Sequence, residues 1–232
     1  MHYVTSDIHG CHGKLMKLLD MLKLKDDDTL FVLGDLADRG SENVKVITTL
    51  AARKNVVALK GNHDYTAALM LRTFGMGERG KDSPLYGKPG AEAVFEAWLA
   101  DGGDTTWAEF ERLSLPEKEV VLRCLRSLPL FTELEIGGQT CHLSHSVPPR
   151  EAMRDETRRS AADFLFGRPD YDKVYFNDKI LVTGHTPTGL IDPVFAGRIL
   201  RKNNHIAVDC GAVFGNPLGC ICLETEEEFY SD

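Results

Sequence analysis

Residues 29–40 read TLFVLGDLADRG, where a short apolar run leads into a turn rich in charged residues. A continuous apolar run of this length is typical of a strand that is buried on both faces of a sheet. Directly after the run come Asp35, Asp38 and Arg39. The stretch therefore predicts a buried strand whose carboxyl end carries chemically useful side chains.

Two flanking stretches repeat the arrangement of a strand followed by polar side chains. Residues 2–6 predict a strand that is followed by Asp7 and His9, and residues 55–60 predict a buried strand that is followed by GNHD. Between the first two of these strands, four leucines in i, i+3, i+4, i+7 spacing predict one face of a helix: Leu15, Leu18, Leu19 and Leu22. This alternation of strands and helices predicts βαβ units and a largely parallel sheet.

The middle of the chain has a different character. Apolar residues keep helical spacing from residue 65 to about 130, and a period of two returns in FTELEIGGQTCHLSHS at residues 131–146. The stretches KILVTGH, GRILRKNNHIAVDCG and LGCICLE then predict short strands of a second, mostly antiparallel sheet. We predict an α/β fold in one domain over residues 1–232, with a helical insertion at about 65–130.

Composition limits the kind of protein. The 232-residue chain is 43% hydrophobic with a mean hydropathy of -0.21, which is typical of a folded domain with a sizeable core. A net charge of -8 argues against a nucleic-acid-binding surface. No apolar stretch approaches the roughly 18–20 residues needed to cross a membrane, and residues 1–10 lack a secretion leader. We therefore predict a cytoplasmic protein that binds neither nucleic acid nor membranes.

Candidate site residues stand at strand ends all along the chain. In an open parallel sheet the carboxyl ends of the strands share one crevice, so these side chains are expected to meet. The side chains that stand there are Asp7, His9, Asp35, Asp38, Arg39, Asn62, His63, Asp64, His145 in HLSHS and His185 in VTGHT. Carboxylate, imidazole and amide ligands without thiolates suit divalent first-row metals. Because the set is too large for one ion, we predict two, with Asp35 shared between them.

Such a pair of ions suits the hydrolysis of a phosphoester. Two ions about 3.5–4 Å apart can hold a hydroxide between them for in-line attack on phosphorus. We expect His63 to protonate the leaving group, with the neighbouring Asp64 orienting its ring. Arg39 is expected to bind the phosphate oxygens, because its planar fork matches them. For the ions we predict Mn first, with Fe, Zn, Co or Ni as alternatives.

The motifs DIHG, GDLADRG, GNHD, a later His and GHT, in this order, resemble those of the calcineurin-like metallophosphoesterases. The closer resemblance is to the phosphoprotein phosphatase branch, which includes lambda-phosphatase-type serine/threonine phosphatases and symmetrical diadenosine tetraphosphatases. The resemblance implies a two-sheet mixed β sandwich with helices on both outer faces, a four-layer αββα fold. It also implies two ligand sets, namely Asp7, His9 and Asp35 for one ion and Asp35, Asn62, His145 and His185 for the other.

A second phosphate-binding arginine is implied after the fourth motif. The stretch FLFGRPD points to Arg168, with Arg150 as a rival. The chain departs from the family where Ser146 and Val147 follow the histidine of the fourth motif, in place of Ala-Gly or Gly-Gly. A side chain then stands where glycine normally lets the backbone approach, which affects the local geometry. Pro187 after GHT is the phosphoprotein phosphatase form and argues against the cyclic-nucleotide and nuclease branches.

Three functions are open at this point. We favour a phosphomonoesterase that acts on phosphorylated proteins. The alternative substrate is a dinucleoside polyphosphate or a similar nucleotide, for which Tyr86, Trp98 and Trp107 are candidate stacking partners, although the helical spacing places Trp98 in the core. A non-catalytic metal-bearing binding module is the third, and the presence of the acid pair and Arg39 argues against it.

Overall fold

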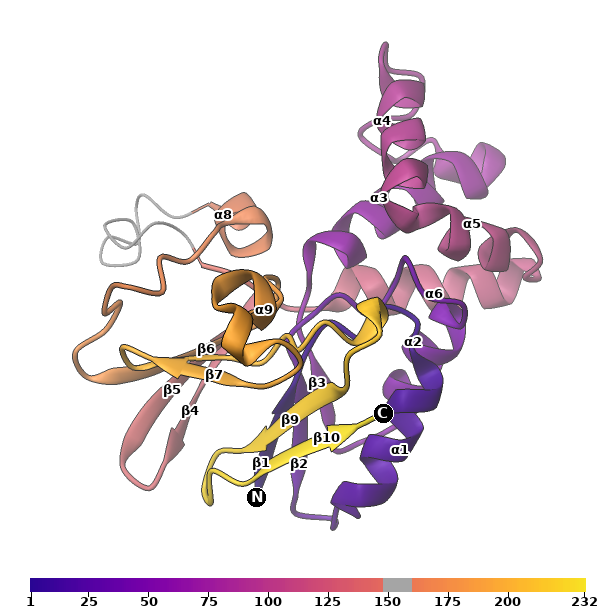
Figure 1. Cartoon of the computed structure of the whole chain (residues 1–232). Coiled ribbons are helices and arrows are strands. Elements are labelled where there is room, and N and C mark those ends of the chain that lie inside the picture. The colour runs from indigo at the N-terminus through magenta and orange to yellow at the C-terminus, as the bar shows by residue number, and fades with distance from the viewer. Residues whose placement is uncertain (148–159) are drawn as a thin grey trace.

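The computed structural model describes residues 1–147 and 160–232 and contains two five-stranded mixed sheets. Figure 1 shows both sheets with helices on either side of them. The first sheet has the order β10-β9-β1-β2-β3, with strands His2–Thr5 (β1), Thr29–Val32 (β2), Val56–Ala58 (β3), Leu218–Cys222 (β9) and Glu228–Ser231 (β10). The second has the order β4-β5-β6-β8-β7, with strands Phe131–Ile136 (β4), Gln139–Ser144 (β5), Lys179–Thr183 (β6), Leu200–Lys202 (β7) and His205–Ala207 (β8).

In the first sheet, β1, β2 and β3 are parallel, as the βαβ pattern predicts. Strand β9 lies antiparallel to β1, with Ile221 opposite Val4, so the assignment of LGCICLE to the second sheet is wrong. All five residues of β9 are buried. An apolar run of this kind indicates burial but does not say which sheet the strand joins.

The second sheet is mixed, which corrects the expectation that it is mostly antiparallel. Strands β5, β6 and β8 are parallel to one another, and only β4 and β7, at the edges, run antiparallel to their neighbours. Parallel neighbours need long crossover connections, and the segments that join β5, β6 and β8 are long enough to provide them. Because β5 and β6 are parallel, they end at the same edge of the sheet, where His145 and His185 follow them.

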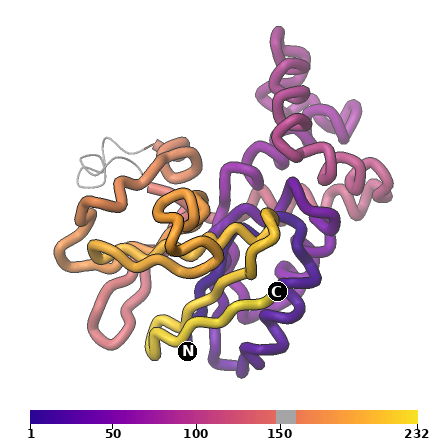
Figure 2. Tube along the Cα trace, viewed as in Figure 1, coloured from indigo at the N-terminus to yellow at the C-terminus, as the bar shows by residue number. Residues whose placement is uncertain are grey.

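Some helices cover the outer faces of the sheets, and others extend beyond them. Their bounds are His12–Leu22 (α1), Asn43–Ala51 (α2), Asn62–Gly75 (α3), Ala91–Trp98 (α4), Asp104–Glu111 (α5), Leu115–Ser127 (α6), Ala161–Phe166 (α8) and Thr188–Ile191 (α9). Short helical turns lie at Gly77–Gly80 (η1), Leu99–Gly103 (η2, a π turn), Pro193–Phe195 (η4) and Ala212–Phe214 (η5). In Figure 2 the segment from α3 to α5 extends away from both sheets. Its status as an insertion within one domain stays a prediction.

Two hydrophobic cores show why residues 30–33 are apolar throughout. Phe31 and Leu33 belong to the core between the sheets, together with apolar residues of β5 and β6. Leu30 and Val32 belong to the core beneath α1, α2 and α6. The predicted α/β class, with two mixed sheets flanked by helices, is confirmed. Among the described residues, no helix combines the length and the apolar character needed to span a membrane.

Candidate metal centre

Six candidate ligands gather where strands of both sheets end. They are Asp7 and His9 after β1, Asp35 after β2, Asn62 after β3, His145 after β5 and His185 after β6. The backbone N–H of His185 donates to Asp7 Oδ2 at 3.0 Å, so residues 178 positions apart in the chain are in contact. The structure therefore places all six predicted ligands around one point, as expected for strands that end at a shared crevice.

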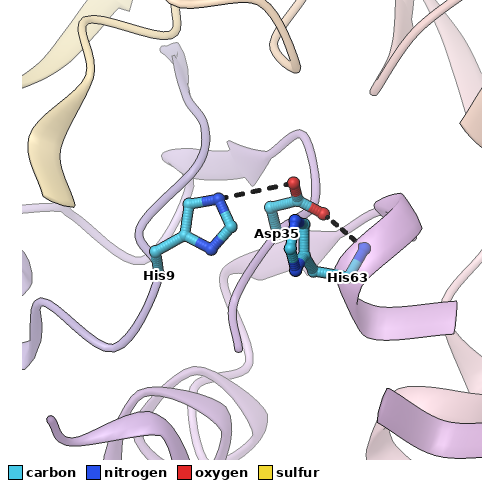
Figure 3. Close-up of side chains that lie close together, drawn as sticks. All are labelled: His9, Asp35 and His63. Carbon is cyan, nitrogen blue, oxygen red and sulfur yellow. Dashed lines mark hydrogen bonds and ion pairs between the residues drawn. The ribbon is translucent and has the colours of Figure 1, made fainter. Parts of the chain in front are cut away.

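Asp35 occupies the middle of this group. Its Oδ2 lies 3.5 Å from Nε2 of His9 and also 3.5 Å from Nε2 of His145. Its Oδ1 accepts the backbone N–H of His63 at 3.0 Å. Figure 3 shows the Asp35 carboxylate between His9 and His63. One carboxylate oxygen thus faces ligands of both predicted sets, which is the arrangement that a shared ligand needs.

The second predicted set is closely packed. The Asn62 Oδ1 atom lies 2.9 Å from Nε2 of His145 and 3.0 Å from Nδ1 of His185. The two ring nitrogens are themselves 3.0 Å apart. Atoms with lone pairs therefore converge on one small volume, next to the Asp35 carboxylate.

Backbone carbonyls fix which ring nitrogen of two histidines faces this volume. His9 Nδ1 lies 2.8 Å from the carbonyl oxygen of Ala37, and His145 Nδ1 lies 2.8 Å from that of Leu33. A carbonyl oxygen can only accept a hydrogen bond, so each Nδ1 carries the proton. Each Nε2 then presents its lone pair to the cluster, as in histidines that bind metals.

Burial changes the proton affinity of the cluster. Burial and the nearby Asp7 carboxylate raise the pKa of Asp35 well above its usual range. Burial lowers the pKa of His9 and His145, and burial together with His145 lowers the pKa of His185 to about 4. The imidazoles are therefore neutral, the form that binds metals, and the crowded carboxylates favour a cation between them. The donor set fits divalent metal ions.

Asp7 is held from two sides. Its Oδ2 accepts the Ser6 hydroxyl as well as the backbone N–H of His185. Asp209 is buried beside this group. Burial, followed by the charge of Asp7, raises the pKa of Asp209 well above its usual range. Asp209 therefore adds to the concentration of buried carboxyl groups here.

The structure corrects the partner predicted for His63. Its Nδ1 donates to Asp38 Oδ2 at 2.9 Å. Asp64 instead accepts backbone N–H groups of the Asp35–Leu36 turn and of Gly61, at 2.8 to 2.9 Å. Adjacent helix residues do not share a direction, so Asp64 cannot orient the ring of its neighbour. The pairing of His63 with Asp64 is wrong, and Asp64 braces the turn that carries Asp35.

Asp38 is fully buried and receives further hydrogen bonds from the helical segment. Its Oδ2 accepts Trp98 Nε1 at 2.8 Å, and its Oδ1 accepts the Thr106 hydroxyl at 2.7 Å. From the sequence, Asp38 is known only as one of the polar residues that follow β2. Its partners lie 60 and 68 positions further along the chain, and no local motif marks them. This network fixes the proton of His63 on Nδ1 and leaves Nε2 facing the site.

Arg39 is held in place by hydrogen bonds to the π turn η2. Its backbone N–H donates to the Gly102 carbonyl at 2.8 Å, and its guanidinium lies 3.3 Å from Asp101 Oδ1. The other Asp101 oxygen is 3.7 Å from His63 Nε2. A Cβ on Gly102, where φ is +96°, would lie 2.6 Å from Arg39 Cγ, so glycine is needed for this approach. An exposed carboxylate therefore stands beside the two groups predicted to act on phosphate.

A cavity of about 380 Å³, here called the central cavity, joins these parts. Its lining includes Asp35, Arg39, Asn62, His63, Asp101, Phe166, Arg168, His185 and Phe214. Arg168 thus lies in the same cavity as Arg39, and Arg150 lies outside the described residues. The Ser146 hydroxyl donates to the Gly167 carbonyl at 2.5 Å. Ser146, which stands where the family has a small residue without a hydroxyl, therefore fixes the position of Gly167, the residue before Arg168.

The aromatic side chains at the central cavity differ from those the sequence suggested. Trp98 is only 4% exposed and already donates to Asp38. Tyr86 lines another cavity, and Trp107 packs against a phenylalanine of α4. Phe166 and Phe214 instead line the central cavity and are 49% and 62% exposed. Phe166 ends the short helix α8 and Phe214 ends the turn η5, and elements this short give no periodic signal in the sequence.

Backbone strain is concentrated at the cluster. Among the described residues, positive φ values at non-glycine positions include those of Asp7, His9, Asp35, Asp38, Arg39 and His185. Such conformations cost on the order of 1 kcal/mol or more each and often mark functional sites. The surrounding fold holds these side chains in position against their intrinsic preferences.

Gly61→Ala should displace Asp35 and weaken metal binding, because a Cβ at this position would lie 2.0 Å from Asp35 Oδ1. We expect Mn affinity to fall on the order of 10–100-fold, as for other changes that misplace a ligand. Isothermal titration with Mn measures this. Gly13→Ala is the matched control, because nothing lies within 4 Å of its Cβ position in α1. Equal Mn affinities in the two variants would contradict the prediction.

Asp101→Asn should strengthen the binding of inorganic phosphate. The side chain is 65% exposed and lies beside Arg39, so removing its charge is worth at most about 1 kcal/mol, or roughly fivefold in Ki. The measurement is the Ki of phosphate against p-nitrophenyl phosphate in the Mn-loaded protein. Asp104→Asn removes the same charge outside the central cavity and serves as the control. Weaker inhibition in Asp101→Asn would show instead that Asp101 holds Arg39 in place.

Comparison with known proteins extends these observations. The family described as calcineurin-like phosphoesterase matches residues 3–189. The asymmetrical bis(5'-nucleosyl)-tetraphosphatase PrpE of Bacillus velezensis is 28% identical over 244 residues, covering 93% of this chain and 86% of that protein. Serine/threonine-protein phosphatase 1 of Salmonella typhimurium is 26% identical over 230 residues, covering 93% and 88%. A serine/threonine phosphatase structure from Saccharomyces cerevisiae has a similar fold, with a TM-score of 0.60, 14% identity and coverage of 100% and 79%.

Proposed function

This chain belongs to the calcineurin-like phosphoesterases, hydrolases with a dinuclear metal centre, and we propose that its substrate is a dinucleoside polyphosphate. The observation that carries the proposal is the placement of exposed Phe166 and Phe214 in the same cavity as Arg39 and Arg168. Aromatic faces bind nucleobases by stacking, and arginines bind phosphates. A nucleotide presents both groups close together.

The residues that would hold the two ions are those of the predicted sets. Asp7, His9 and Asp35 would hold one, and Asp35, Asn62, His145 and His185 the other. When bound, two divalent ions supply positive charge to the phosphoryl oxygens and lower the pKa of a water molecule. Mn is our first proposal for their identity, because the ligands are oxygen and imidazole nitrogen without thiolate.

The remaining chemistry belongs to side chains of the central cavity. Arg39 and Arg168 would bind and orient the phosphate chain. His63 would give its Nε2 proton to the departing oxygen, while Asp38 accepts the Nδ1–H and stabilises the charged ring. The buried bonds from Trp98 and Thr106 keep the Asp38 carboxylate in place for this role.

A phosphorylated protein is the second candidate substrate, which the sequence analysis favoured. The relative from Salmonella typhimurium supports it, since its identity of 26% is close to the 28% of the tetraphosphatase relative. The exposed rings of Phe166 and Phe214 in the central cavity favour a nucleotide over a phosphorylated protein as the substrate. A phosphoserine side chain has no base to place against them.

A panel of three substrates tests the proposal on the Mn-loaded protein: diadenosine tetraphosphate, a phosphoserine peptide and p-nitrophenyl phosphate. One stacked base is worth 1–3 kcal/mol, so we expect kcat/KM for the dinucleotide to exceed that for the peptide by about tenfold or more. Chromatography of the products separates asymmetrical cleavage, which gives AMP and ATP, from symmetrical cleavage, which gives ADP alone. A higher kcat/KM for the peptide than for the dinucleotide would contradict the proposal and indicate a phosphorylated protein as the substrate.

A further inference from the structure

A second cavity lies beside the start of α3. Its volume is about 250 Å³, and its lining includes Lys60, Tyr65, Arg72, Asp82 and Arg126. We call it the Lys60 cavity. Three cationic side chains and one acidic one surround it, in a chain whose net charge is -8. The local charge is therefore opposite to that of the whole protein.

Two of the three cations form no ion pair within 4.0 Å among the residues that the structure describes, although Asp64 acts on Lys60 and Asp82 acts on Arg126 over a longer distance. Arg72 pairs with Asp82 at 2.6 Å. Lys60 Nζ donates only to the backbone carbonyl of Arg126, at 3.1 Å, and the Arg126 guanidinium has no carboxylate within 4.0 Å in the described chain. The Lys60 side chain is half-buried. A half-buried ammonium and a guanidinium that makes no close ion pair, on the same cavity, favour an anionic ligand.

The Lys60 cavity adjoins the candidate metal centre. Lys60 precedes Asn62 by two residues, and Tyr65 follows it by three on α3. The Tyr65 ring lines the Lys60 cavity and packs edge-on against Phe166, with ring centroids 6.4 Å apart. Phe166 in turn lines the central cavity. The Tyr65–Phe166 pair is therefore a wall that both cavities share.

We propose that the Lys60 cavity is a second phosphate-binding site, in which Lys60 and Arg126 bind phosphate groups of a nucleotide. The site does not belong to the reacting phosphate, which is assigned to the central cavity. If the phosphates that bind here are the distal phosphates of the substrate, this second site rests on the proposed function. A free nucleotide offers the same chemistry, and the experiment below separates the two sources.

The test uses the Mn-loaded protein and the double variant Lys60→Met/Arg126→Gln. Methionine keeps most of the apolar stem of Lys60, so the change removes charge with little loss of packing. The control variant Lys54→Met/Arg112→Gln removes the same two charges from exposed positions that line neither cavity. Equal kcat on p-nitrophenyl phosphate in all three proteins shows that the fold and the metal centre are intact.

Two measurements follow on these proteins. The first is calorimetric titration with α,β-methylene-ADP, whose carbon bridge prevents cleavage between its phosphates. We expect two sites in the original protein and in the control, and one site in the Lys60→Met/Arg126→Gln variant. The second is the KM for diadenosine tetraphosphate, which we expect to rise on the order of tenfold in that variant alone, because two charge-assisted contacts are lost.

Each outcome decides between the alternatives. A higher KM for the dinucleotide identifies the ligand as the distal phosphates of the substrate. Loss of the second nucleotide site with an unchanged KM identifies a free nucleotide. Two results would overturn the proposal, each together with an unchanged KM for the dinucleotide. One is a single nucleotide site in the original protein, and the other is two sites in both double variants. If the dinucleotide is not hydrolysed at all, the proposed function fails and the titration still tests the site.

Discussion

Asp35→Asn should abolish both metal binding and hydrolysis. One Asp35 oxygen lies 3.5 Å from ligand nitrogens of His9 and of His145, so a single charge serves both predicted ligand sets. We expect Mn affinity to fall by at least about 100-fold, and kcat/KM by on the order of 10³ or more. Metal content after gel filtration and p-nitrophenyl phosphate turnover measure the two effects.

Folding must be separated from metal binding in this test. Asparagine is close in shape to a protonated aspartic acid, and burial already raises the pKa of Asp35. We therefore expect the Tm of the metal-free variant to be equal to or above that of the original protein. Asp20→Asn, an exposed position on α1, is the control for the change of charge. Two retained ions per chain in Asp35→Asn would contradict the shared-ligand assignment.

His63→Asn should leave metal content near that of the original protein and lower turnover by a factor on the order of 10²–10⁴. The loss depends on the leaving group if His63 is the acid. Phenyl phosphate, whose leaving oxygen needs a proton, should lose most of its rate, and p-nitrophenyl phosphate much less. Steady-state kinetics on both substrates measure this, and an equal loss on the two would remove His63 from the acid role.

Two further variants examine the corrected partner of His63. Asp38→Asn removes the charge that stabilises the His63 ring, and we expect it to reproduce the leaving-group dependence with a smaller loss, on the order of 10–10². Asp64→Asn disturbs three backbone contacts instead. It should lower the Tm without changing the ratio of the two rates. A leaving-group effect in Asp64→Asn alone would restore the original pairing.

Much of the fold and the ligand cluster could be predicted because the informative residues are local. Each motif combines a buried strand with the polar residues that follow it, and parallel strands end at a common edge. DIHG, GDLADRG and GNHD therefore predict both the first three strands and the meeting of Asp7, Asp35 and Asn62. The structure places these side chains together, in the order β1-β2-β3.

The parts that sequence could not supply depend on contacts between distant segments. Asp38 acquires its role from Trp98 and Thr106, which belong to the helical segment. Asp101 approaches Arg39 only because the π turn breaks the helical path at Gly102. The prediction that LGCICLE belongs to the second sheet was wrong for the same reason. The apolar run of β9 fits the interior of either sheet, and only its pairing with β1 decides between them.

The central claim is that two metal ions share Asp35. Crystals of the protein grown with Mn, measured at the Mn absorption edge, test it most directly. We predict two anomalous peaks about 3.5–4 Å apart, both in contact with the Asp35 carboxylate. One peak should lie beside His9 and the other beside Asn62, His145 and His185. A single peak, or two peaks of which only one touches Asp35, would contradict it.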